Sequence, residues 1–337
     1  MASIRSLRSA AAALALLSAP AAYANEADWF TSLYTGEGME LRADERIFAL
    51  YSLFNAMGYD EAPVARQFPL PKHQFHPVRA EVRQKLMTAD PEVRKQANAF
   101  FDQNPRPMDR YVAYAVHSAP PPFSTGAKAK ELQDVKGLEN LLKTTYTQWN
   151  LQDLMGQVQG EYRKALKAWL PVVDAPVSKA RKLLRVPDAT QSLLVMNLLE
   201  AENKIVGVMG DGEVVLVVGP SQKPDVQALV TEYARVIVEP QVGKRAQSGW
   251  SGGAALLREA QLSGATEQTV SEYATALFAR AVALKAMDAP DSAYDALAQK
   301  GYYGVKDIAQ RMDGAGAIDG WALDALRTAE SRRPARK

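Results

Sequence analysis

The stretch Gly212-Glu-Val-Val-Leu-Val-Val-Gly-Pro220, followed by Asp225-Val-Gln-Ala-Leu-Val-Thr-Glu-Tyr-Ala-Arg-Val-Ile-Val-Glu-Pro240, decides the fold expected of this chain. Its first part is short, apolar and rich in β-branched valine, which is typical of a buried strand. In its second part, apolar residues recur at the spacing of one helix face: Val226, Leu229, Val230, Tyr233 and Ile237. The pattern predicts a strand, a loop and a helix.

Two further apolar runs precede this segment, at residues 192–199 and 204–209. The second run is separated from the strand at 213–218 by Asp211-Gly212, a pair that tolerates the positive φ of a tight hairpin turn. We therefore expect about three strands that are largely antiparallel.

Helical patterns dominate the remainder of the chain. From about residue 42 to 185 they begin with Ile47, Leu50, Leu53 and Phe54, and Pro77 and Asp90-Pro91 open further helices. Pro171 and Pro176 lie within the last stretch of this region. Beyond the strands, helices are expected at 226–239, 269–286 and 318–329.

These patterns predict an α+β fold that is mainly helical, with one small, largely antiparallel sheet before the helix at 226–239. They divide the chain into an N-terminal helical region at 25–188 and a region of sheet plus helices at 189–330. The basic segment 331–337 is expected to be a solvated end.

The N-terminus has the pattern of an export signal. Arg5 and Arg8 precede the apolar run 10–17, and Ala22-Tyr23-Ala24 supplies the small residues of a cleavage site. The run is shorter than the roughly 20 residues needed to span a bilayer. We expect residues 1–24 to be a cleaved signal peptide, and the alternative is a buried N-terminal helix.

The amino-acid composition indicates the cellular compartment and excludes one class of partner. The absence of cysteine fits a bacterial protein exported to the periplasm or the medium. Removing residues 1–24 takes away two arginines and leaves 38 basic and 38 acidic residues, so no nucleic-acid partner is expected. No later stretch is apolar enough to suggest a membrane span, and the sequence does not indicate an oligomeric state.

The predicted helix carries the pentapeptide Thr231-Glu232-Tyr233-Ala234-Arg235. Its position after a small sheet with a hairpin resembles that of the His-Glu-x-x-His helix in gluzincin-type zinc peptidases. In that family the two histidines, at i and i+4 on one helix face, bind zinc, and the glutamate activates the metal-bound water. A glutamate from a later helix completes the zinc ligands, and Glu272 stands at a matching distance along the sequence.

The resemblance implies a degenerate site, because Thr231 and Arg235 stand where the histidines would be. No metal or other cofactor is expected. Arg235 brings a fixed positive charge to the metal position, where Glu232, Glu239 and Glu272 are candidates to pair with it. We therefore hypothesise a salt-bridge cluster, in a catalytically inactive protein that binds a peptide or protein partner in the residual cleft, with the edge at 204–218 accepting an extended ligand.

Other interpretations remain open. The helix at 226–239 is also explained as an ordinary amphipathic helix with a solvated charged face, in a helical envelope protein that binds a partner or has a structural role and is unrelated to peptidases. A hydrolase that uses another site is a third possibility, although there is no cysteine nucleophile and no Gly-x-Ser-x-Gly motif.

The chain has three histidines, His73, His76 and His117. The first two have a spacing that would allow both to bind one metal, with His117 as the candidate third ligand of a three-histidine site, but proline flanks the pair and no acidic partner is evident. We favour a helix cap or loop hydrogen bond for His76.

Overall fold

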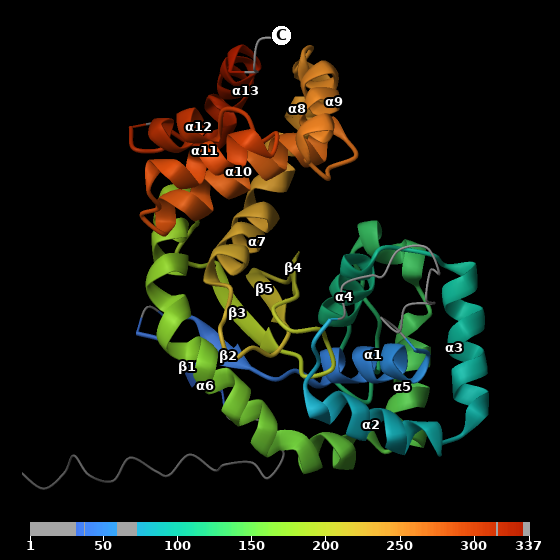
Figure 1. Cartoon of the computed structure of the whole chain (residues 1–337). Helices are drawn as coiled ribbons and strands as arrows, with labels where there is room; N and C mark the ends of the chain where they lie inside the picture. The colour runs from blue at the N-terminus through green and yellow to red at the C-terminus, as the bar shows by residue number, and fades with distance from the viewer. Residues whose placement is uncertain (1–31, 37, 59–72, 315, 333–337) are drawn as a thin grey trace, which may run out of the picture.

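Helices surround one five-stranded sheet and make up most of the chain (Figure 1). The chain is described from a computed structural model, which covers residues 32–36, 38–58, 73–314 and 316–332. The predicted α+β, mainly helical fold class is confirmed. The predicted signal peptide at 1–24 and the end of the basic tail at 333–337 lie outside the described residues.

The sheet is mixed rather than largely antiparallel. Its strands, in the order β1-β2-β3-β5-β4, are β1 (Leu33–Tyr34), β2 (Glu40–Arg42), β3 (Gln191–Met196), β5 (Glu213–Val218) and β4 (Ile205–Met209). The outer pairs β1–β2 and β4–β5 are antiparallel, whereas β2–β3 and β3–β5 are parallel. The difference arises because β5 inserts between β3 and β4, and because two short strands come from the region that was predicted to be helical.

The hairpin predicted at Asp211-Gly212 joins β4 to β5. Gly212 has φ +80°, a conformation that glycine adopts without strain. The turn closes with the Gly210 amide donating to the Glu213 carbonyl at 2.8 Å. This hairpin leaves β4 at one edge of the sheet.

The N-terminal helices pack against one another beside the sheet. They are α1 (Glu45–Ala56), α2 (Pro77–Met87), α3 (Pro91–Gln103), α4 (Met108–His117) and α5 (Leu138–Gln148). As predicted, α2 begins at Pro77, and Asp90 caps α3 by accepting from the Glu92 amide. His76 caps α2 by accepting from the Val78 amide at 3.3 Å, which confirms the preferred role for this histidine.

A single long helix, α6 (Leu151–Leu184), connects the N-terminal helices to β3 and curves around the molecule (Figure 1). It continues through Pro171 and Pro176, and neither proline ends the helix. The residues four positions earlier, Lys167 and Val172, are exposed, so solvent can reach the carbonyls that lose their helical partners. The buried face, which includes Tyr162 and Trp169, holds the helix against the core.

The remaining helices follow the sheet. They are α7 (Val226–Val238), α8 (Lys244–Gly249), α9 (Gly253–Ser263), α10 (Val270–Ala286), α11 (Asp291–Gln299), α12 (Val305–Arg311) and α13 (Ala322–Ser331). Most of the apolar stripe predicted on α7 is buried against the sheet and α10. Within the described ranges, no helix combines the length and apolar character needed to cross a membrane.

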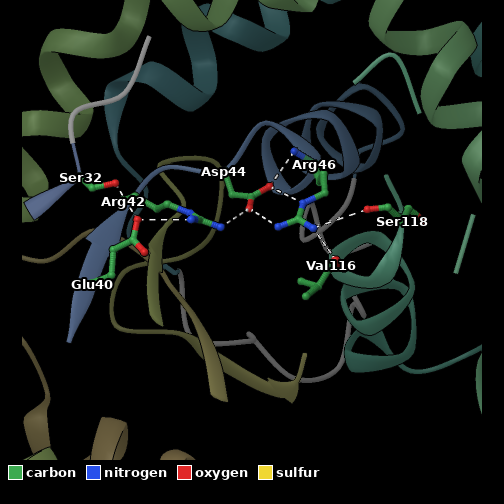
Figure 2. A network of polar contacts seen from close by, with 7 residues as sticks. All are labelled: Ser32, Glu40, Arg42, Asp44, Arg46, Val116 and Ser118. Atoms are coloured by element: carbon green, nitrogen blue, oxygen red, sulfur yellow. Dashed lines mark hydrogen bonds and ion pairs between the residues drawn. The ribbon is translucent and has the colours of Figure 1, made fainter. Parts of the chain in front are cut away.

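A polar network joins the strand β2 to the helices α1 and α4 (Figure 2). Arg46 of α1 donates to both carboxylate oxygens of Asp44, at 2.9 and 2.6 Å, and to the carbonyls of Val116 and Ser118 at the end of α4. Burial alone would raise the pKa of the Asp44 carboxyl, but the hydrogen bonds and charge of Arg46, with the charge of Arg42, hold that pKa below its ordinary value. The network therefore fixes α4 beside the first turn of α1.

Candidate functional site

The predicted site residues lie together at a cavity of about 390 Å³ between α7 and α10. The side chains that line it come from α7, from its end, from α10 and from the loop before α10: Thr231, Glu232, Arg235, Glu239, Thr266, Glu267, Glu272, Thr275, Ala276, Ala279 and Arg280. Thr231, Glu232, Arg235 and Glu272, the four positions identified from the sequence, all belong to this set.

Arg235 is the centre of the polar contacts on α7. Its Nε and Nη2 donate to the two carboxylate oxygens of Glu232 at 2.9 and 2.8 Å, and its Nη1 donates to Glu239 at 2.7 Å. Both predicted ion pairs of Arg235 along the helix are therefore confirmed. Burial alone would lower the pKa of Arg235, but the carboxylates of Glu232, Glu239 and Asp109 raise it above its ordinary value, so this charge is permanent.

The ion pair of Glu232 and Arg235 also contacts β4, the edge strand of the sheet. Glu232 Oε1 accepts from the Gly207 amide at 2.8 Å, and Arg235 Nη2 donates to the Gly207 carbonyl at 2.7 Å. Gly207 permits this close approach because a Cβ there would lie 2.7 Å from Val236 Cγ2 and 3.0 Å from Glu232 Cγ. A glycine within a β-branched strand is the sequence signal for such an approach, and it was missed.

A histidine from α4 contacts the same strand. His117 Nε2 lies 2.9 Å from the Met209 carbonyl, and its Nδ1 lies 3.1 Å from Asp211 in the hairpin turn. His117 is far along the chain from His73 and His76, and its contacts tie α4 to the β4–β5 hairpin. This arrangement gives it a structural role rather than a place in a three-histidine site.

Glu272 lines the cavity, but its carboxylate faces the start of its own helix. It accepts from the amides of Gln268 and Thr269, at 2.8 and 3.3 Å, while Thr269 accepts from the Glu272 amide in a reciprocal capping box. The hypothesised pairing of Glu272 with Arg235 is therefore wrong, because helix capping directs the carboxylate elsewhere, and this outcome weighs against the peptidase-like interpretation.

Glu267 and Arg280 form the ion pair on the α10 side of the cavity. Their side chains meet at 3.3 Å, and Arg280 stacks over the ring of Tyr302 at 3.7 Å. The Tyr302 hydroxyl donates to Glu267 at 3.2 Å. Sequence reasoning missed this pair, because the two residues are separated by a helix start and only the fold brings them together.

The residues that the resemblance assigns to a zinc site do not fit zinc. The Thr231 hydroxyl donates to the Gln227 carbonyl of its own helix at 2.7 Å, and Arg235 is a cation that supplies no ligand atom. Across the described part of the chain, no group of three or more histidine, cysteine, aspartate or glutamate side chains is arranged to hold a metal ion. The arrangement supplies fixed charges and hydrogen bonds rather than a metal-activated water.

Comparisons with protein-family models, with curated proteins and with solved structures find no match to this chain. The geometry of the cavity and of the strand edge beside it is therefore the basis on which function is proposed.

Proposed function

We propose that this chain is an exported, non-catalytic protein of metallopeptidase-like architecture that binds a peptide in the cavity between α7 and α10. The supporting observation is the set of contacts of Arg235, which bonds to Glu232, to Glu239 and to the edge strand. The resemblance assigns this residue to the place of a zinc-binding histidine. A guanidinium there neutralises the carboxylates without activating water, so binding is retained while hydrolysis is lost.

The charges around the cavity favour a basic ligand. Four glutamates line it, Glu232, Glu239, Glu267 and Glu272, against the two arginines Arg235 and Arg280, although the Glu272 carboxylate caps its own helix. The excess of negative charge favours a lysine or arginine side chain over an acidic one. The ligand class proposed is therefore a peptide that carries basic residues.

The test compares two short dye-labelled peptides of equal length, one rich in lysine and one rich in glutamate, by fluorescence anisotropy. The proposal predicts binding of the lysine peptide, with mass spectrometry showing that the bound peptide stays intact. Equal affinity for both peptides, or cleavage that a chelator abolishes, contradicts it.

A pair of charge reversals separates the cavity from the net charge of the protein. Glu239→Lys changes a carboxylate of the cavity and is expected to weaken binding of the lysine peptide several-fold. Glu92→Lys makes the same change in net charge on the exposed face of α3 and is expected to have no effect. Similar losses in the two variants would place binding outside the cavity.

The second candidate is a helical envelope protein, binding or structural, that is unrelated to peptidases. It is favoured by the side-chain contacts on Gly207, because they occupy hydrogen-bonding groups that an extended ligand on the edge strand would use. Failure of both peptides to bind a folded protein would support this candidate over the first.

A further inference from the structure

Along β4, the backbone groups of successive residues point alternately toward β5 and toward the outer edge of the sheet. The Gly210 amide and the Lys204 carbonyl bond to β5, through Glu213 and Gly219. Since the register is antiparallel, the even-numbered residues of β4 face β5, and the backbone groups of Ile205, Gly207 and Met209 point outward. These outward groups are the ones to which another strand would pair.

Side chains already occupy the centre of this edge. An antiparallel partner residue would accept from the Gly207 amide and donate to its carbonyl. Glu232 accepts from that amide and Arg235 donates to that carbonyl, while the two side chains are bonded to each other at 2.8 Å. The ion pair thus reproduces both hydrogen bonds of a missing neighbouring strand, and His117 supplies the contact to the next outward carbonyl, that of Met209.

The sequence of β4 explains why its edge needs cover. Ile205-Val-Gly-Val-Met209 contains no charge and no proline, the features that commonly prevent strands from pairing between molecules. We infer that Glu232, Arg235 and His117 form an edge cap, which keeps β4 from pairing with β4 of a second copy of this chain. Glu232 and Arg235 also line the cavity, but this role assigns a function to the ion pair whether or not a peptide binds there.

A two-residue variant tests the cap through self-association. Glu232→Ala/Arg235→Ala removes both side chains together, so neither charge is left without its partner at Gly207. Sedimentation velocity is expected to show a species of twice the wild-type mass at the same concentration, because the variant frees both backbone groups of Gly207 and a two-fold axis can pair two β4 strands.

The matched control is Arg245→Ala/Asp319→Ala, which removes the ion pair between Arg245 of α8 and Asp319, a residue before α13. This variant is expected to sediment as the wild type does. An uncapped variant that is folded and keeps the wild-type mass contradicts the inference, as does equal association of the control.

Amide exchange measured by NMR tests the cap without removing the charges. The shorter side chain of Glu232→Asp keeps the charge but not the reach to Gly207, so the Gly207 amide is expected to exchange about tenfold faster than in the wild type. The Gly210 amide, bonded to Glu213, is the internal reference and should be unchanged. A wild-type Gly207 amide that exchanges as fast as that of the variant would overturn the inference.

Discussion

Two arginine–carboxylate networks in this protein have similar chemistry and different surroundings. The Asp44 side chain is 6% exposed and that of Arg46 is 14% exposed, and both serve only to join β2, α1 and α4 (Figure 2). The side chains of Glu232 and Arg235 are 20% and 29% exposed and lie between a cavity and a strand edge. We therefore expect the closed network to contribute more to stability, whereas the open network carries the proposed roles in peptide binding and in covering β4.

The largest effect is expected in the closed network. Arg46→Ala leaves the Asp44 carboxylate buried without its main partner and should lower the free energy of unfolding by about 3 kcal/mol. Urea denaturation measures the change, and Arg42→Ala, which removes a longer contact of 3.4 Å to the same carboxylate, is the milder control. If Arg46→Ala is no more destabilising than Arg42→Ala, the contrast between the two networks is wrong.

The closed network should also determine part of the acid stability. The pKa of Asp44 is lowered in the folded protein below the ordinary value of 3.8, so its contribution is complete above that value and is lost as pH falls through 3.8 toward the folded pKa. Asp44→Asn removes this titration. The free energy of unfolding, followed by urea denaturation from pH 6 downward, should therefore fall more steeply in the wild type than in the variant; parallel curves would refute the prediction.

An intermediate effect is expected in the open network. Arg235→Ala removes hydrogen bonds to Glu232 and to the Gly207 carbonyl at partly exposed positions, and should cost about 1.5 kcal/mol. A double-mutant cycle with Glu232→Ala, measured at a protein concentration where the double variant is monomeric, should give a coupling free energy of about 1 kcal/mol. Additive losses would mean that the two side chains do not act as a unit.

The smallest effect is expected at the cavity rim. Glu239 is 56% exposed and pairs with Arg235 four residues earlier, so Glu239→Ala should change stability by less than about 0.5 kcal/mol. Thermal unfolding provides the measurement. A loss as large as that of Arg235→Ala would show that the rim is part of the structural core of the network.

The features that sequence predicted well are local. The strand, loop and helix around residue 220 follow from periodicity, and the pairs of Arg235 with Glu232 and Glu239 follow from helical spacing alone. The strands β1 and β2 were missed because two and three residues are too few to show a pattern.

The features that sequence did not predict depend on packing or on a competing local interaction. The contact of Glu232 with Gly207 joins residues 25 positions apart, and only the packing of α7 on β4 brings it about. Glu272 had a local signal that was overlooked, because a threonine three residues before a glutamate is the pattern of a capping box. That signal alone predicts a carboxylate turned toward its own helix.

The central claim is that Arg235 occupies the metal position of a metallopeptidase-like scaffold. The variant Thr231→His/Arg235→His places two imidazoles at i and i+4 on the cavity face of α7, leaves Glu232 unchanged and frees the Glu239 carboxylate from Arg235. Isothermal titration calorimetry with zinc is the measurement, and Thr231→Ala/Arg235→Ala is the control for loss of the arginine. We predict about one equivalent of zinc bound by the histidine variant and none by the wild type or the control. A folded histidine variant that binds no more zinc than the alanine control would contradict the claim.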